Sequence, residues 1–287
     1  MLLTSLGATL VLAAVSYGTY RYLQLTEQKA ALEQNVSVLR GEVAGLEQSL
    51  LANRATLEGT NQALQNEQNK NGIFASQIGE LSGTVNTLQK LTATDPQLLE
   101  KYSKVYFLSD NYVPATLSAI DSQYLFDKTR PELILSGVLP YLNALIATAG
   151  RSGVGLQIIS AYRSFYEQAS LKLGYKIVYG AGTANQFSAE QGYSEHQLGT
   201  TVDFSTPEVK DTFSKFASSS AYRWLTDNAY QFGFILSYPP NNIYYQFEPW
   251  HWRFVGVKLA TTLHANNEYF YNLGQRDIDQ YLISFFD

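Results

Sequence analysis

The chain has 287 residues, of which 45% are apolar and 16% are charged, so it holds enough hydrophobic material for a folded core and is not a disordered protein. The formal net charge is −5 and no block of lysine and arginine occurs, which argues against nucleic acid as a partner. Cysteine is absent, which excludes disulfide scaffolds, iron–sulfur clusters and thiol nucleophiles. Histidine chemistry has to be built from His196, His251 and His264, and we assign no role to His264.

The first segment, residues 1–22, has the pattern of a membrane helix. Residues 1–20 carry no charge, and twenty helical residues span about 30 Å, the thickness of a bilayer core. Three tyrosines gather at the end of the segment, where interfacial aromatic residues are common. A cleaved signal peptide is the alternative, because residues 14–16 (Ala-Val-Ser) resemble a small-residue cleavage site. We expect an uncleaved membrane anchor.

Residues 25–92 predict a coiled-coil stalk. A heptad register runs from Leu25 to Leu88, and most of its seam positions are large and apolar, which favours a parallel homodimer. Polar seam residues and several glycines weaken the middle of the segment. A helical hairpin that folds back on the rest of the chain is the alternative. The dipeptide Asp95-Pro96 is expected to end the helix, because proline cannot continue it.

The remaining residues, 95–287, predict one domain of the α+β class, with a small antiparallel sheet flanked by helices and a motif-bearing core at about residues 100–260. Helices and short strands alternate here without regular repetition. In chain order we expect a helix over residues 131–149, a strand over 156–160, a helix over 164–174, a strand over 201–204, a helix over 220–232, a strand over 243–247 and a strand or bend over 251–255.

The candidate chemistry lies in three short segments of this domain. His196, Asp203 and His251 supply the three protein ligands that a catalytic zinc site uses beside an open water position. Glu248 stands three residues before His251, where a carboxylate can take a proton from the water and pass it to a leaving amine. Arg163 offers paired N–H donors to a carboxylate or an oxyanion.

Two rival readings of these residues are weaker. Two histidines and one carboxylate can also hold non-haem iron, but those sites usually place the acid one residue beyond the first histidine rather than at the spacing of His196 and Asp203. A serine hydrolase is disfavoured, because the sequence contains no Gly-x-Ser-x-Gly elbow.

Together, the three segments resemble the VanY-type D-alanyl-D-alanine carboxypeptidases, which are zinc metallopeptidases of bacterial cell walls related in fold to the D-alanyl-D-alanine dipeptidases and to the hedgehog signalling domain. The resemblance rests on three ordered motifs: Tyr162-Arg163-Ser164, Ser194-x-His196-x-x-Gly199-x-x-x-Asp203 and Glu248-x-x-His251. It covers about residues 100–260 and leaves out the first hundred residues.

The resemblance implies that His196, Asp203 and His251 bind zinc, that Glu248 is the general base and acid, and that Arg163 contacts the substrate or stabilises its transition state. It also implies that Ser194 and Gln168 lie at the terminus of the bound peptide. One departure is Thr201, where this family often has alanine.

The expected function is a zinc-dependent carboxypeptidase that removes the C-terminal D-alanine from peptidoglycan stem peptides. The topology that this substrate requires places residues 25–287 on the outer side of the cell membrane, although Arg21 and Lys29 weakly favour the opposite. Other possibilities are a non-catalytic cell-wall-binding module on a stalk and a coiled-coil scaffold that binds a protein partner. The sequence does not choose between D,D- and L,D-carboxypeptidase or endopeptidase activity.

Overall fold

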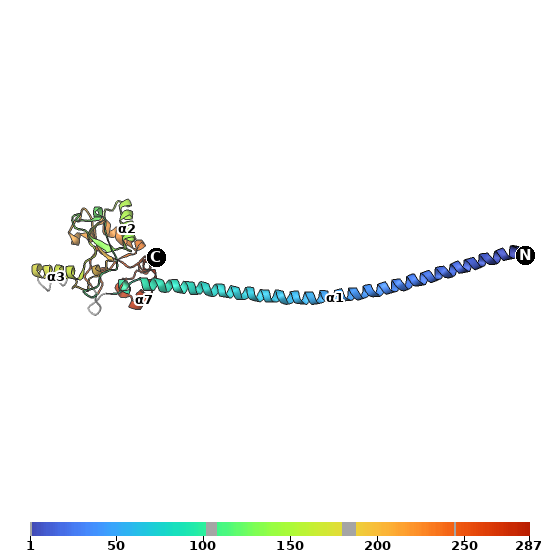
Figure 1. The fold of residues 1–287 in the computed structure, drawn as a ribbon. Helices are drawn as coiled ribbons and strands as arrows, with labels where there is room; N and C mark the ends of the chain where they lie inside the picture. The colour runs from blue at the N-terminus through green and yellow to red at the C-terminus, as the bar shows by residue number, and fades with distance from the viewer. Residues whose placement is uncertain (1, 102–107, 180–187, 244) are drawn as a thin grey trace. The chain divides into compact units, whose positions relative to one another are not determined.

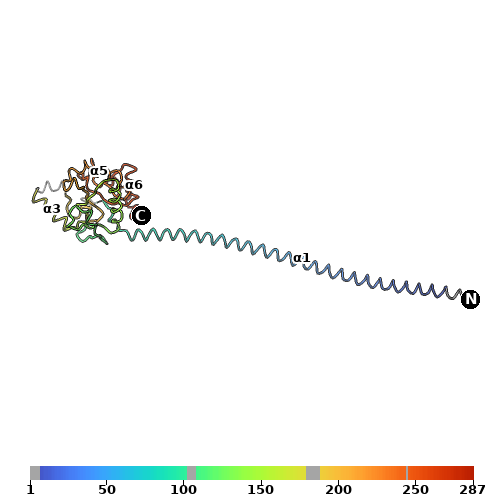
Figure 2. The backbone as a smooth tube through the Cα atoms, turned by 90° about the horizontal axis from the view of Figure 1, so that it is seen from above, coloured from blue at the N-terminus to red at the C-terminus, as the bar shows by residue number. Residues whose placement is uncertain are grey.

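The computed structural model describes residues 2–101, 108–179, 188–243 and 245–287, with the side chains described from Gly7 onward. The chain divides into two compact units, residues 1–82 and residues 83–287. The first unit is formed by helix α1 (Leu2–Ala93), whose last turns belong to the second unit (Figures 1 and 2). The helix ends two residues before Asp95, whose side chain accepts a hydrogen bond from the backbone N–H of Gln97 and so caps the 3₁₀ turn that follows.

The predicted membrane anchor over residues 1–22 is wrong. Within the part of the chain that the structure describes, no helix combines the length and the apolar character needed to cross a bilayer. The structure thus contradicts the predicted anchor and the single-pass localisation built on it.

The second unit mixes short helices with two small sheets. Its helices after α1 are α2 (Leu139–Arg151), α3 (Phe165–Tyr179), α5 (Ser220–Asn228), α6 (Val257–Asn266) and α7 (Gln275–Asp279). Its 3₁₀ turns are η1 (Pro96–Leu99), η2 (Ser122–Tyr124), η3 (Glu195–Leu198), η4 (Phe213–Ser218), η5 (Ala229–Phe232), η6 (Phe270–Asn272) and η7 (Leu282–Ser284). Its strands are β1 (Leu117–Ala119), β2 (Leu133–Leu135), β3 (Gln157–Ser160), β4 (Thr201–Ser205), β5 (Phe234–Leu236) and β6 (His251–Phe254). This composition confirms the α+β class.

The main sheet is antiparallel and has the strand order β3-β4-β6-β5, while β1 and β2 form a separate antiparallel pair. Side chains alternate between the two faces of a strand, so the register decides which residues share a face. Val202 pairs with Trp252, and both belong to the hydrophobic core together with Phe204 and Phe254. The opposite face carries Asp203 beside its partner His251, together with other polar residues of β4 and β6. One face of the sheet therefore builds the core and the other builds the site.

The helices cover the apolar face and complete the core. Helix α2 buries Leu142, Leu145 and Ile146, and α6 buries Leu259 and Leu263. Helices α5 and α6 both pack against η5. The core thus gives the sheet a fixed support for its polar face.

Several predicted elements differ from the structure. Residues 133–135 form strand β2, so the helix predicted over 131–149 begins only at Leu139. Periodicity alone does not distinguish a short apolar strand from a segment of helix. The strand predicted over 243–247 is wrong for its described residues, which form bends and irregular loop, and Tyr244 lies outside the described residues. One edge of the main sheet is formed by β5, which follows Gly233 and was not predicted.

The segment after α1 is joined to the polar face of the sheet through Arg253 of β6. The guanidinium of Arg253 is fully buried, and its Nη2 donates to the carbonyl oxygens of Leu98 at 2.8 Å and Glu100 at 3.0 Å. Its Nη1 donates to Glu195 Oε1 at 2.7 Å, and the guanidinium carbon lies 4.7 Å from the ring centre of Phe270. A buried charge is stable only with such partners.

Thr201 gives a prediction about stability. Its side chain is fully buried in β4, and its hydroxyl has no hydrogen-bond partner among the described residues. We expect Thr201→Val to raise the free energy of unfolding of the full chain by about 1 kcal/mol, because it removes an unsatisfied buried donor at nearly constant volume. Denaturant unfolding measures this change. Thr201→Ser, which keeps the hydroxyl, is the control, and a less stable valine variant would contradict the prediction.

Candidate metal centre

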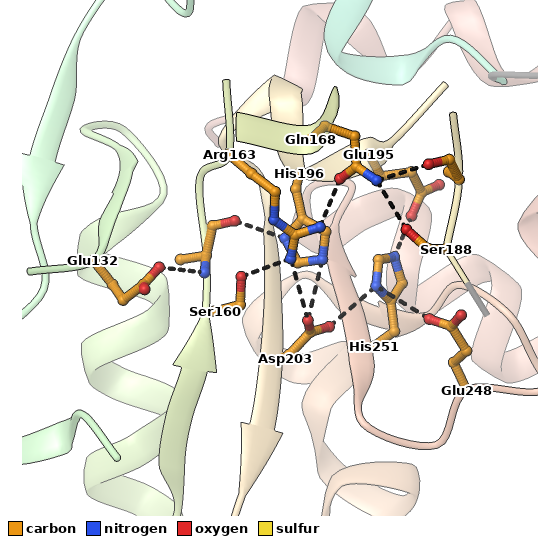
Figure 3. A network of polar contacts seen from close by, with 12 residues as sticks. Glu132, Ser160, Arg163, Gln168, Ser188, Glu195, His196, Asp203, Glu248 and His251 are labelled. Atoms are coloured by element: carbon orange, nitrogen blue, oxygen red, sulfur yellow. Dashed lines mark hydrogen bonds and ion pairs between the residues drawn. The ribbon is translucent and has the colours of Figure 1, made fainter. Parts of the chain in front are cut away.

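His196, Asp203 and His251 meet at one point on the polar face of the sheet (Figure 3). One ligand atom from each residue lies within 4.8 Å of the other two. His196 Nε2 is 3.2 Å from Asp203 Oδ2, and His251 Nδ1 is 3.2 Å from Asp203 Oδ1. All three side chains are buried. Ligands that each lie about 2.0–2.2 Å from a tetrahedral zinc ion have separations of this size, so the donor set fits zinc.

The sheet register and one tight turn bring the three residues together. Asp203 of β4 and His251 of β6 are direct cross-strand partners, so their side chains lie on the same face. His196 lies in η3, and the chain turns at Gly199, directly after η3, into β4. Gly199 has a φ of 69°, a left-handed conformation that strongly favours glycine. A side chain at this position would also approach the backbone nitrogen of Leu135 to 3.2 Å.

In each histidine, one ring nitrogen contacts a hydrogen-bond acceptor outside the centre, and the other faces Asp203. His196 Nδ1 is 2.6 Å from the carbonyl oxygen of Ala161, which leaves Nε2 at the centre. His251 Nε2 is 2.9 Å from Glu195 Oε2, which leaves Nδ1 at the centre. Metal-binding histidines characteristically donate their second N–H in this way, to a carbonyl or a carboxylate.

The charges of the centre suit a cation. Although burial opposes its ionisation, Asp203 has a pKa well below its ordinary value, because both imidazoles lie beside it. Burial alone would lower the pKa of His251, but hydrogen bonds to Asp203 and Glu195 raise it to about 10. Burial lowers the pKa of His196 and keeps its ring neutral. The centre therefore has negative carboxylates around a position that favours positive charge.

Glu248 lies next to the three residues without being one of them. Its Oε2 is 3.7 Å from His251 Nδ1, and its side chain is 20% exposed. A turn fixes this position. The backbone N–H of His251 donates to the carbonyl oxygen of Glu248, and the backbone N–H of Glu248 donates to the carbonyl oxygen of Tyr238. Burial raises the pKa of Glu248 to about 7, partly opposed by the nearby His251. A carboxyl group with such a pKa can both accept and return a proton near neutral pH.

Arg163 lies beside Asp203, and Gln168 contacts Arg163 (Figure 3). Arg163 Nη2 is 4.0 Å from Asp203 Oδ2 and donates to Ser160 Oγ at 2.8 Å, while Nη1 donates to Gln168 Oε1 at 2.6 Å. The amide nitrogen of Gln168 donates to Ser188 Oγ and to the carbonyl of Ala189. Gln168 therefore orients Arg163 in this structure.

Ser194 is the predicted site residue that the structure joins least clearly to the others. It is buried and stands directly before η3, where its carbonyl accepts from the backbone N–H of Gln197. Among the described contacts, none links its hydroxyl to His196, Arg163 or Gln168.

Two buried carboxylates behind the histidines, Glu195 and Glu132, were not predicted from the sequence. Glu195 contacts His251, and Glu132 Oε2 accepts from the N–H of Ala161 at 2.8 Å, the residue whose carbonyl faces His196. Glu195 adjoins His196 in the motif, but its partners lie 42 or more positions further along the chain. No local pattern reveals such contacts.

Comparison with known proteins places the chain in a family. A family model described as VanY, D-alanyl-D-alanine carboxypeptidase, matches residues 133–257. YodJ of Bacillus subtilis is 32% identical over 71% of this chain and 78% of its own length. A D-alanyl-D-alanine carboxypeptidase of Enterococcus faecalis is 31% identical over 62% of this chain and 67% of its own length.

Solved structures agree. The LD-carboxypeptidase LdcB has a TM-score of 0.57 and 31% identity over 62% of this chain and 85% of its own. The vancomycin-resistance D,D-pentapeptidase VanY of the VanB-type cassette, in complex with Zn(II), has a TM-score of 0.51 and 28% identity over 61% of this chain and 97% of its own. The fold is that of these peptidases, and the buried donor set could hold a metal ion. The chain belongs to the VanY family of D-alanyl-D-alanine carboxypeptidases.

The turn at Gly199 gives a prediction. We expect Gly199→Ala to lower the free energy of unfolding by about 2 kcal/mol, because alanine is strained in the left-handed conformation and meets the backbone of Leu135. The matched control is Gly153→Ala, where φ is 76° but nothing lies within 4 Å of the added carbon. Denaturant unfolding of both variants separates conformational strain from contact. Equal losses would contradict a role for the contact.

Proposed function

We propose that the chain is a zinc-dependent carboxypeptidase that removes the C-terminal D-alanine from peptidoglycan stem peptides. The proposal is carried by the buried group of His196, Asp203 and His251, flanked by Glu248 and Arg163. Two imidazoles and one carboxylate are a common ligand set of catalytic zinc. Structures of related VanY enzymes have been solved in complex with Zn(II) and with D-alanine-D-alanine. They support the same metal and the same substrate class here.

In this proposal His196 binds zinc through Nε2, His251 through Nδ1, and Asp203 through a carboxylate oxygen. When bound, the zinc ion supplies a Lewis acid that polarises the scissile carbonyl and lowers the pKa of water toward 7. The hydrogen bonds from the far nitrogens of the two rings hold the near nitrogens toward the ion.

Glu248 moves the proton. Its Oε2 lies close to His251 Nδ1 yet outside the ligand group, so the carboxylate is free to accept a proton from the attacking water. The same carboxyl group then donates that proton to the nitrogen of the departing D-alanine. Burial of the side chain raises the pKa of Glu248 and so favours its role as a proton acceptor and donor.

Arg163 stabilises negative charge on the substrate. Its guanidinium lies beside the centre and is held there by Ser160 and Gln168, so its N–H groups are positioned for the developing oxyanion or for the terminal carboxylate. The contacts of Gln168 favour an orienting role, and direct binding of the peptide terminus by Gln168 and Ser194 remains the prediction made from the family motif.

A second candidate is L,D-carboxypeptidase activity. The observation that favours it is the similarity to the LD-carboxypeptidase LdcB, which has a TM-score of 0.57, against 0.51 for the D,D-pentapeptidase VanY. Both activities would use the same proposed metal and proton-transfer residues. They differ in the residue that precedes the departing D-alanine.

The test is mass spectrometry of stem peptides incubated with the zinc-loaded full chain. A pentapeptide that ends in D-alanyl-D-alanine and a tetrapeptide that ends in one D-alanine distinguish the two specificities. We expect Glu248→Gln to lower turnover by about 10²–10⁴-fold while zinc content stays at that of the parent, because the variant loses the proton acceptor and keeps the ligands. His196→Ala is the matched variant and is expected to lose the metal.

Each outcome is decisive for a different part of the proposal. Undiminished turnover by Glu248→Gln removes the assigned role of Glu248. Stoichiometric zinc in His196→Ala rejects the ligand set. A zinc-loaded parent that releases no D-alanine from either peptide favours a non-catalytic wall-binding module.

We also propose that the first unit forms a parallel coiled-coil homodimer. Helix α1 exposes a regular series of leucines at its seam positions, among them Leu25, Leu32, Leu39 and Leu46, each more than half exposed in the single chain. Such a stripe lowers its exposure to water when it packs against a second copy of the same helix.

The homodimer is tested by sedimentation equilibrium of the full chain. Leu46→Asp places a charge in the seam and is expected to weaken dimerisation more than about 10-fold. Leu51→Asp is the matched control, because Leu51 is 66% exposed but lies outside the seam. A monomeric parent, or equal effects of the two variants, would contradict the proposal.

A further inference from the structure

Glu195 is a fully buried carboxylate at the back of the candidate metal centre. Its Oε1 accepts three hydrogen bonds, from Ser237 Oγ at 2.8 Å, Arg253 Nη1 at 2.7 Å and the Tyr271 hydroxyl at 2.8 Å. Its Oε2 faces His251 Nε2 at 2.9 Å. The carboxylate is therefore held from one side by three donors and presents its other oxygen to a single imidazole.

This arrangement fixes which nitrogen of His251 carries the proton. An ionised carboxylate only accepts hydrogen bonds, so its partner nitrogen Nε2 must be the donor. In the neutral ring that a metal ligand requires, Nδ1, which points at Asp203, is then the nitrogen with a lone pair available to a cation. Glu195 Oε1 pairs with the guanidinium of Arg253 at 2.7 Å, the partner that a buried carboxylate requires.

The two histidines are fixed by different means. His196 is held by the carbonyl oxygen of Ala161, a backbone group that keeps its acceptor in any variant. His251 is held by the side chain of Glu195, and the ring also stacks on Tyr238 at 4.4 Å between ring centres. Stacking fixes the plane of the ring but does not distinguish its two nitrogens, so the hydrogen bond to Glu195 makes that distinction.

We propose that Glu195 is a positioning residue that orients His251 and sets its tautomer for zinc. The inference rests on the proposed function, because it takes His251 as a ligand. Glu195 itself contacts neither substrate nor metal and acts through the imidazole. Outer hydrogen-bond partners of this kind change metal affinity by about 10–100-fold when they are replaced.

Glu195→Gln is the direct test, because glutamine keeps the shape and loses the acceptor-only character. If its amide oxygen faces Ser237, Arg253 and Tyr271, its NH₂ group faces His251 and forces the ring proton onto Nδ1, where it blocks the metal. If the amide is turned over, its NH₂ group faces the donors instead. Either orientation weakens the centre.

The readout is the zinc dissociation constant of the full chain, measured by competition with a chelator, together with thermal unfolding of the metal-free protein. We expect a 10–100-fold weaker zinc affinity for Glu195→Gln. Tyr271→Phe is the matched control, since it removes one donor to Oε1 but leaves the contact with His251, and its zinc affinity is expected to change by less than about threefold. Nitrogen NMR of the three histidines adds a signature, with a protonated His251 Nε2 in the zinc-loaded parent and loss of that signal in Glu195→Gln.

Glu195→Gln also leaves the buried charge of Arg253 without its carboxylate, which can destabilise the fold by itself. A second comparison avoids this effect by starting from the variant Arg253→Met, which lacks the buried guanidinium. This variant is compared with the double variant Glu195→Gln/Arg253→Met, in which both charges are absent. The same 10–100-fold loss of zinc affinity is expected between these two.

Unchanged zinc affinity in a folded Glu195→Gln variant overturns the inference, and so does a loss of fold in both backgrounds, which assigns Glu195 to structural support. Failure of the proposed function looks different, because in that case the parent itself binds no zinc or, when loaded with zinc, releases no D-alanine.

Discussion

Asp203 and His251 face each other across β4 and β6, and the centre depends on that register. A slip of one residue between the strands would turn Asp203 or His251 toward the apolar core, in place of Val202 or Trp252. The core residues oppose such a slip, because Phe204 and Phe254 on the apolar face would have to enter the polar face. Hydrophobic packing on one side of the sheet therefore sets the geometry of the chemistry on the other side.

Residues at the ends of the strands position His196 relative to Asp203 and His251. Gly199 lets the chain reverse directly after η3, so that His196 reaches the sheet only a few residues before Asp203. Ala161, at the end of β3, supplies the carbonyl that orients the His196 ring. Strand ends and one left-handed residue thus place both imidazoles with little freedom, which lowers the conformational cost of holding a metal.

The residues that could be predicted from the sequence are those with chemistry of their own. His196, Asp203 and His251 could be found because histidine is scarce in this chain and the ordered motifs mark the positions. The structure brings them together, while their individual roles stay proposals. Glu195 could not be found, since its importance comes from Ser237, Arg253 and Tyr271, which are distant in sequence and gather only after folding.

The errors in the fold have physical causes as well. The apolar run after residue 131 satisfies a helical period, but tertiary pairing with β1 draws its first part into β2. The aromatic residues around Phe247 have high strand propensity, yet they lie in a loop that leads to Glu248. At the N-terminus, composition resembled a membrane span, and the described helix is not apolar over a sufficient length.

The buried guanidinium of Arg253 has a consequence for how the chain can be divided. It ties the main-chain oxygens of Leu98 and Glu100 to the strand that carries His251, so the peptide following α1 is an integral part of the catalytic half rather than a passive tether. A protease cut or a gene truncation downstream of this junction would strip the arginine of two acceptors in the protein interior. The smallest autonomous fragment must therefore start upstream of residue 98.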